Sequence, residues 1–349
     1  MPTDFSRRMF LGGSGALLAH GLLAKSQSAP PSGTSAVSLV KGESRRKIVH
    51  GALEAIDDQI QPVLKRKKYV VIKPNNVSTV NQLAATHAEA LHGILDYLEP
   101  RFKGPVIIAE SSAGETMQGF ENFHYDRLSA ERRSQKVSLV DLNTEARYET
   151  MPLIDFDLHP SPVRLAARLF DPDAFIICSA ILKTHNTVVA TLSVKNMVLG
   201  APLHNAPKET PHWNDKRRYH TGVRQTHYNM FLTAQKMKPF WGATVIDGFE
   251  GMEGNGPASG TPVPSRVAIA STDYIAADRV GVEAMGIDAK WVGYLNFCGQ
   301  FGVGQFDLEK IDVRGEKLAS IRKKYQLHQD IERELLWMGP ITDLPPKLG

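Results

Sequence analysis

The chain has 349 residues, of which 42% are hydrophobic and 22% charged, values typical of a globular protein of one large or two modest domains. Its 41 Lys and Arg nearly balance 37 Asp and Glu, and the basic clusters lack interleaved aromatic side chains, which excludes nucleic acid as an expected partner. The two cysteines form no CxxC pair, which excludes a cysteine-ligated iron–sulfur cluster or a four-cysteine zinc site in this chain. Cys178 and Cys298 lie in apolar segments, where we expect buried, reduced thiols; a disulfide between them stays open.

The first 29 residues resemble a twin-arginine export signal. Arg7 and Arg8 precede a weakly hydrophobic segment, 12–24, that is too short to span a membrane, and small residues follow it. The resemblance implies passage through the Tat translocase and removal of the signal, with no stable membrane span after cleavage. The expected location is the periplasm or the cell surface. Because this route carries folded proteins, often with a cofactor inserted, a metal or cofactor is compatible with it.

After a Pro- and Ser-rich linker, 30–43, six short apolar runs that end in polar side chains predict strands. These runs are 69–72, 106–109, 137–140, 174–182, 243–246 and 267–270. Helical patterns are found at 44–64, 86–98, 162–169, 228–237, 273–285 and 310–325. Ser161 and Pro162 are the expected N-cap and first residue of the third. The alternation predicts an α/β fold: a mostly parallel sheet with helices on both faces, in one large domain or two closely packed α/β lobes.

The stretch 174–200 is the most informative part of the chain. Its strand is nearly all apolar, as in strands buried on both faces of a sheet. Polar residues follow abruptly, and a helical pattern runs from about Thr187 to Gly200, the expected C′ residue. Open α/β sheets bind ligands beyond the carboxyl ends of their strands. We therefore expect a site here that contains Lys183, His185, Lys195 and Asn196.

Two stretches do not follow the alternation of strands and helices. Residues 204–227 are polar and contain four histidines, and they are predicted to form an excursion or lid between two parts of the core, 44–203 and 228–340. Residues 248–264 are rich in glycine, so that Gly254 and Gly256 can let the backbone approach a ligand closely; a flexible hairpin tip is the alternative. The remaining residues, 341–349, are expected to form a tail.

Several segments are familiar when they are taken together. They are IKPNN at 72–76, LKTHN at 182–186, SVKNMVLG at 193–200, VIDGFEGMEGNGP at 245–257 and ASTDYIAADRVGVEAMG at 270–286. In this order they resemble the family DUF362, a domain of unknown function. The resemblance implies no established reaction, so function has to come from the site. Many family members carry ferredoxin-type cysteine clusters, which this chain lacks, and a redox role therefore does not carry over.

Three groups of residues carry the expected chemistry. Lysines that converge can hold a carboxylate, a phosphate or an enolate-like transition state, and a desolvated lysine can act as a base or form a Schiff base; the alternative is that each lysine pairs with a carboxylate. Catalytic roles are expected for Lys183, His185 and Lys195. Substrate-binding roles are expected for Lys73, Asn75, Asn76, Asn196, Gly254 and Gly256. Carboxylates suited to a divalent cation are Glu110, Asp247 and Glu250, which can instead balance the lysines. For His87 we expect a structural role.

These residues predict an enzyme that acts on a small anionic or carbonyl-bearing molecule, with lysines holding the anion and His185 or a carboxylate moving a proton. A metal is an open possibility and no cofactor is specified. Two alternatives remain at this point. One is a non-catalytic binding protein or a maturation factor for a metal or cofactor, and the other is an accessory to a separate redox partner.

Overall fold

The computed structural model describes residues 33–132, 134–205 and 213–339. Its strands are β1 Ser35–Lys41, β2 Tyr69–Lys73, β3 Val106–Glu110, β4 Val137–Asp141, β5 Tyr148–Ile154, β6 Pro160–Ala166, β7 Ala174–His185, β8 Val189–Thr191, β9 Trp241–Glu253, β10 Thr261–Val263, β11 Val267–Ser271 and β12 Ile311–Gly315. Its α-helices are α1 Arg45–Glu54, α2 Asp57–Leu64, α3 Ala88–Leu98, α4 Thr116–Asn122, α5 Asp126–Glu131, α6 Ser193–Gly200, α7 Val223–Met237, α8 Tyr274–Ala284, α9 Gly293–Gln300, α10 Leu318–Ile321 and α11 Ile331–Glu334. None of the helices in these ranges is long and apolar enough to cross a bilayer.

Ten strands form one sheet, in the order β12-β1-β11-β9-β7-β2-β3-β4, with β8 beside β7 and β10 beside β9. All neighbours from β9 to β4 are parallel, which confirms the predicted mostly parallel sheet. β11 is antiparallel to both β9 and β1, so its end at Ser271 lies at the opposite edge from the ends of β2, β3 and β7. The expectation that six strand ends meet at one edge is wrong for β11, because the chain turns back after β9 as a hairpin through β10, which already pairs antiparallel with β9.

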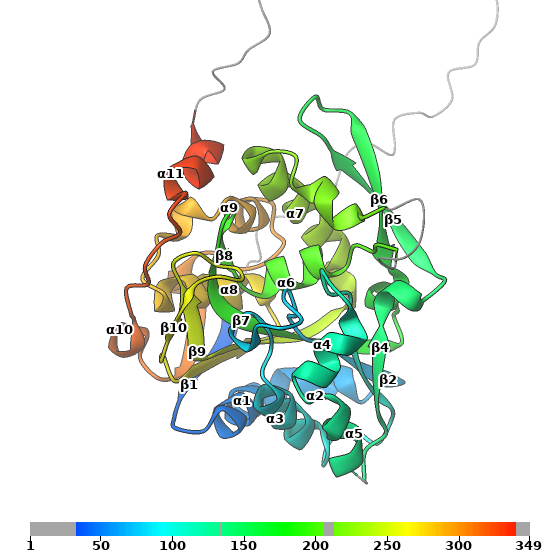
Figure 1. Ribbon diagram of the computed structural model, residues 1–349. Coiled ribbons are helices and arrows are strands. Elements are labelled where there is room, and N and C mark those ends of the chain that lie inside the picture. The colour runs from blue at the N-terminus through cyan, green and yellow to red at the C-terminus, as the bar shows by residue number, and fades with distance from the viewer. Residues whose placement is uncertain (1–32, 133, 206–212, 340–349) are drawn as a thin grey trace, which may run out of the picture.

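Helices cover both faces of the sheet (Figure 1). On one face α1, α2 and α3 pack with α4 and α5 over an aliphatic and aromatic core that includes Leu53, Leu91 and Phe120. On the other face α6, α7, α8 and α9 pack over a second core, which includes Met197 and Val280. The hairpin of β5 and β6 extends outward from the edge of this arrangement (Figure 1). The predicted α/β architecture with helices on both faces is therefore present.

The central strand β7 is buried along its whole length. It continues beyond Leu182 to His185, because β8 folds back and pairs antiparallel with its last three residues. The helix expected from Thr187 is therefore wrong at its start, and α6 begins at Ser193. Gly200 is the last residue of α6 rather than a C′ residue. A Cβ at that position would overlap the Nζ of Lys73, which is a reason for glycine there.

Two predicted helices are strands. The segment 162–169 is largely β6, whose Val163 and Leu165 face the core in alternation against β5, so Ser161 and Pro162 cap no helix. The segment 310–325 contains β12, which pairs with β1, and only a short helix, α10. Pairing with an existing sheet edge overrode local helical periodicity in this segment. The expected linker, 30–43, contains β1, which lies inside the sheet.

Other helices follow the predictions more closely. The pattern at 44–64 is divided into α1 and α2, since Ile56 leaves the helical conformation and Asp57 and Asp58 start a new helix. The pattern at 86–98 is α3, with His87 as its N-cap: His87 Nδ1 accepts a hydrogen bond from the Glu89 N–H at 3.1 Å, the structural role expected of it. Both cysteines are buried and free, and burial raises the pKa of Cys178 to about 12, so the expectation of reduced thiols is confirmed.

The expected export signal and C-terminal tail lie outside the described residues, as do residues 206–212 of the excursion. The described part of the excursion packs against the core. His204 forms a β-bridge with Asn214, a short 3-10 helix, η4, spans Asp215–Tyr219, and α7 begins at Val223. Buried Asp215 binds Arg164 of β6, with 2.9 Å from Nε to Oδ2. Whether this segment acts as a lid stays a prediction.

Candidate functional site

A cavity of about 240 Å³ opens at the carboxyl edge of the sheet, and we call it the Lys195 cavity. Four segments form its walls: the ends of β2 and β3 with their following loops, helix α6, and the η4 region. The polar side chains of this lining are Lys73, Asn75, Asn76, Glu110, Ser111, Lys195, Asn196, Asn214, Lys216, Arg217 and His220. The site therefore lies where open α/β sheets bind ligands.

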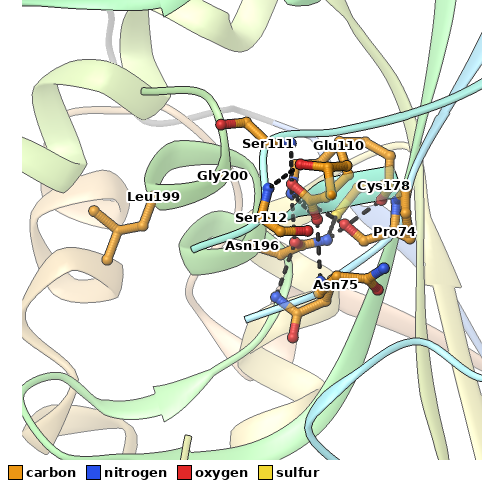
Figure 2. Close-up of polar contacts among 12 residues, drawn as sticks. Pro74, Asn75, Glu110, Ser111, Ser112, Cys178, Asn196, Leu199 and Gly200 are labelled. Atoms are coloured by element: carbon orange, nitrogen blue, oxygen red, sulfur yellow. Dashed lines mark hydrogen bonds and ion pairs between the residues drawn. The ribbon is translucent and has the colours of Figure 1, made fainter. Parts of the chain in front are cut away.

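A buried ion pair forms the floor of the Lys195 cavity. The Lys73 Nζ lies 2.8 Å from Glu110 Oε1, and the two side chains are 1% and 2% exposed. Lys73 also donates to Asn196 Oδ1 at 2.9 Å and to the Pro74 carbonyl at 3.0 Å, so all three of its donors have partners. Figure 2 shows Glu110 and Asn196 converging from β3 and α6. Such complete pairing is what a buried ion pair requires to be stable.

Two asparagines after β2 contact this ion pair and keep unused polar atoms. Asn75 Nδ2 donates to Asn196 Oδ1 at 3.0 Å (Figure 2), and the Asn76 N–H donates to Glu110 Oε2 at 3.1 Å. Asn75 Oδ1 and Asn76 Nδ2 are buried and have no hydrogen-bond partner among the described residues. One acceptor and one donor are therefore left on residues that line the cavity.

Lys195 has a different environment from Lys73. Its side chain is 6% exposed, and it donates no hydrogen bond and forms no ion pair within the described ranges. Burial, and then the neighbouring Lys73 ammonium, lower the pKa of Lys195 to about 8, while Glu110 acts in the opposite direction. A large part of the Lys195 population is therefore uncharged at slightly alkaline pH.

The excursion supplies further cations that our sequence analysis did not name. Lys216 is half-buried, and its Nζ lies 3.4 Å from the carbonyl oxygens of both Leu199 and Gly200, at the end of α6. Burial lowers the pKa of Lys216 to about 7, with Glu110 opposing and Lys73 adding to the effect. Arg217 lines the same wall. The sequence contained a signal for these cations. It is the run of basic residues at 216–218, inside the segment expected to be an excursion or lid.

His185 is buried and does not line the Lys195 cavity. Its Nδ1 accepts a hydrogen bond from the Thr187 N–H at 3.1 Å, which leaves the proton of the neutral ring on Nε2. Burial, and then Lys195, lower the pKa of His185 well below its usual value. Its ring stacks on that of His220, with centroids 6.4 Å apart, and His220 is exposed at the rim. His185 therefore contacts the rim of the cavity through His220 and does not line the cavity itself.

Lys183 is fully buried and does not line the Lys195 cavity. Its Nζ donates to the Ala84 carbonyl at 3.0 Å and to the Pro257 carbonyl at 3.2 Å, and it joins the loop after β2 to the glycine-rich loop. Burial, and then Lys195, lower the pKa of Lys183 well below its usual value. The lysine expected to be catalytic thus serves as a link between loops.

The glycine-rich loop packs on its own chain. A Cβ at Gly256 would overlap the Thr184 carbonyl oxygen, and Thr184 Oγ1 donates to the Gly254 carbonyl at 2.9 Å. Gly254 lines a separate surface hollow with Gln326 and Gln329. The glycines expected to let the backbone approach a ligand instead let it approach β7.

The three carboxylates expected to bind a divalent cation do not come together. Glu110 pairs with Lys73, whereas Asp247 pairs with Arg45, with 3.0 Å from Arg45 Nε to Asp247 Oδ2. Asp247 and Glu250 line a different, narrow pocket. Burial raises the pKa of Asp247, and Arg45 opposes this. Within the described parts of the chain, no three or more His, Cys, Asp or Glu side chains are grouped so as to hold a metal ion.

Comparison with known proteins identifies a family but no activity. A family model described as a domain of unknown function, DUF362, matches residues 70–283, a range that contains every residue of the Lys195 cavity. No curated protein matches the chain. A crystal structure of a Thermotoga maritima protein from a structural genomics consortium is similar at 14% identity and a TM-score of 0.38, over 59% of this chain and 51% of that one. The chain thus spans about half the length of that protein. We draw no conclusion about this chain from so weak a similarity.

Proposed function

The chain belongs to the DUF362 family of domains of unknown function, and we propose that it is an enzyme that acts on a small anionic, carbonyl-bearing molecule in the Lys195 cavity. Among the described residues, the lining combines Lys73, Lys195, Lys216 and Arg217 with one carboxylate, Glu110, which is already bound by Lys73. This excess of cationic groups favours an anion as the ligand.

The observation that carries the proposal is the amine of Lys195: the residue is only 6% exposed, and its amine has no hydrogen bond or ion pair among the described residues. Burying an unpaired cation is unfavourable, and proteins keep such groups mainly where function requires them. A bound anion would supply the partner that Lys195 lacks. With its lowered pKa the same amine can also give up a proton to the ligand or take one from it.

The size of the cavity supports a small ligand. Its volume of about 240 Å³ lies below the ~300–1,000 Å³ typical of pockets for drug-sized molecules. The free acceptor on Asn75 and the free donor on Asn76 add polar contacts that a short, oxygen-rich molecule can use. This volume favours a small molecule over a large cofactor or a polymeric substrate.

The first test is binding, measured by isothermal titration calorimetry with lactate and with inorganic phosphate. We expect the wild-type protein to bind at least one of them and the double variant Lys195→Met/Lys216→Met to lose that binding. Lys65→Met, at an exposed lysine far from the cavity lining, is the matched control and keeps wild-type affinity. Absence of binding by the wild type to either anion contradicts the proposal.

The second test is proton transfer. We expect the protein to accelerate exchange of the carbon-bound protons of a small oxo acid, such as pyruvate, with D₂O, measured by NMR, and the Lys195→Met variant to lose this activity. Anion binding without exchange on either pyruvate or oxobutyrate would instead favour a non-catalytic binding protein. The wild-type level of exchange in Lys65→Met controls for reaction at surface amines.

We also propose that the first 29 residues direct export through the Tat translocase to the periplasm or cell surface. The paired Arg7 and Arg8 and the weakly hydrophobic segment after them support this proposal. The charge-preserving variant Arg7→Lys/Arg8→Lys should remain inside the cell with its signal uncleaved, measured by fractionation and mass spectrometry. Normal export of this variant would contradict the assignment.

A further inference from the structure

The three lysines that line the Lys195 cavity in the described part of the chain differ in what their amines contact. The Lys73 amine binds Glu110, Asn196 and the Pro74 carbonyl, and these contacts occupy all three donors. The Lys216 amine lies against two main-chain carbonyls at 3.4 Å. The Lys195 amine contacts no acceptor within the described residues. Among the described lysines of this lining, Lys195 is therefore the one whose amine is held by no acceptor.

The charges around Lys195 favour the loss of its proton. Besides burial, Lys73 on β2 is the cationic neighbour that lowers the pKa of Lys195, and Lys183 on β7 and Lys216 on η4 lie near enough to interact with it. The nearest opposing charge is Glu110, which Lys73 already binds through both carboxylate oxygens. A buried amine among other amines behaves as a nucleophile rather than as a fixed cation.

We propose that the Lys195 Nζ forms an imine with a small 2-oxo acid, and this inference rests on the function proposed above. The uncharged amine adds to the ketone carbon, a C–N bond forms, and the carbonyl oxygen takes up a proton. The C–O bond of this carbinolamine then breaks, water leaves with the former carbonyl oxygen, and a C=N bond remains. The two protons on nitrogen leave with that water, so no oxidant or reductant is needed.

The other wall of the cavity suits the carboxylate of such a substrate. Lys216 and Arg217 come from the η4 region, a different segment from Lys195 on α6. A 2-oxo acid has its carboxylate next to its ketone, so one molecule can reach cations on one wall and the amine on another. The short distance between the carboxylate and the ketone of a 2-oxo acid is also compatible with the small volume of the cavity.

The experiment is reductive trapping with pyruvate and sodium borohydride on the full-length chain, followed by digestion and peptide mass spectrometry. We expect a saturable reduced adduct on Lys195, in preference to exposed Lys65, that lactate suppresses by competition. Lactate has the same carbon skeleton without the ketone. The variant Lys195→Arg keeps a cation in the cavity and should lose the adduct while it still binds lactate; its melting temperature checks that it folds.

The outcomes separate this inference from the proposed function. Lactate binding by the wild type, with no pyruvate adduct on Lys195 or with equal labelling of Lys195→Arg, overturns the imine and leaves the anion cavity in place. An adduct confined to Lys216 also overturns it. Failure of the wild type to bind lactate or phosphate overturns the proposed function itself.

Discussion

Two clusters at the carboxyl edge of the same sheet contain similar residues and have different roles. At the ends of β2 and β3, Lys73 and Glu110 pair with each other, and Lys195 beside them has no partner in the described chain. Near the end of β7, Lys183 binds two carbonyls, and in the middle of β9, Asp247 binds Arg45. We call the second cluster closed, because groups of the protein bind both of its side chains. We call the first cluster open, because Lys195 has no partner among the described residues. A buried lysine thus indicates a site only where the protein itself does not satisfy it.

The largest effect is expected from breaking the buried ion pair below the open cluster. Lys73→Met leaves the Glu110 carboxylate buried without its cation, which should lower the free energy of unfolding by ~3–5 kcal/mol, measured by urea denaturation. The double variant Lys73→Met/Glu110→Gln should recover part of this loss. Lys68→Met, which removes an exposed ion pair with Asp173, is the control, with a loss of ~0–1 kcal/mol. Equal losses of unfolding free energy in Lys73→Met and Lys68→Met would contradict the distinction between the buried and the exposed ion pair.

The closed cluster should respond in stability and not in binding. Lys183→Ala removes a fully buried side chain and leaves the Ala84 and Pro257 carbonyls without a donor, so we expect a loss of ~2–5 kcal/mol in unfolding free energy. Its affinity for lactate or phosphate, measured at a temperature where it is folded, should stay close to that of the wild type. A loss of binding as complete as in Lys195→Met/Lys216→Met would place Lys183 in the open cluster.

Removing the Lys195 ammonium should raise the free energy of unfolding, whereas Lys73→Met and Lys183→Ala should lower it. The pKa of Lys195 is lowered from 10.5 to about 8, so the unfavourable buried ammonium is fully present below pH 8. Between pH 8 and 10.5 the folded chain has lost a proton that the unfolded chain keeps, so wild-type stability rises with pH through this window. Lys195→Met has no such ammonium and should be more stable than the wild type by ~1–3 kcal/mol at pH 7, since a lowered pKa of this size corresponds to about 3 kcal/mol.

The measurement for Lys195→Met is urea denaturation at pH 7 and at pH 10. Its advantage over the wild type should shrink at the higher pH, while Lys65→Met, at an exposed lysine, should show no such change. A Lys195→Met variant that is less stable than the wild type at pH 7 would mean that the ammonium has a stabilising partner. That result would remove the main argument for an anion in the cavity.

The smallest effect is a steric one at the floor of the open cluster. Gly200→Ala places a Cβ on the Lys73 amine, so Lys73 must shift, and we expect anion affinity to fall about tenfold, ~1.4 kcal/mol. Gly51→Ala in α1 is the control, because its Cβ would only touch Val40 at 3.9 Å and alanine favours a helix by ~1 kcal/mol. Unchanged affinity in Gly200→Ala would mean that the position of Lys73 does not matter for binding.

The fold was predictable where the chain has long, unbroken apolar runs. The run at 174–182 predicted β7, since a strand covered on both faces must be apolar at every position. The segments 162–169 and 310–325 were wrongly predicted as helices, because their short patterns fit either period and pairing with β5 and β1 decided the outcome. Local patterns cannot show which sheet edge a segment will reach.

The site was predictable at the strand ends and not in the excursion. Lys73, Glu110, Lys195 and Asn196 were named from the chain alone, and the structure brings them into contact or into one cavity. Lys216 and Arg217 were missed because their segment has no periodic pattern that fixes its path over the core. Asp247, Glu250 and Gly254 were expected in the same site, yet they line other hollows.

The sequence by itself determined the α/β class, the family and the residue types at the carboxyl edge, since apolar runs and motif order are local properties of the chain. The tertiary structure alone decided which of those polar side chains satisfy one another. Pairing depends on distances between segments more than a hundred residues apart, such as Lys73 and Asn196 at 2.9 Å. For that reason only the folded chain distinguishes Lys183, whose amine is bound to the main chain, from Lys195, whose amine has no partner among the described residues.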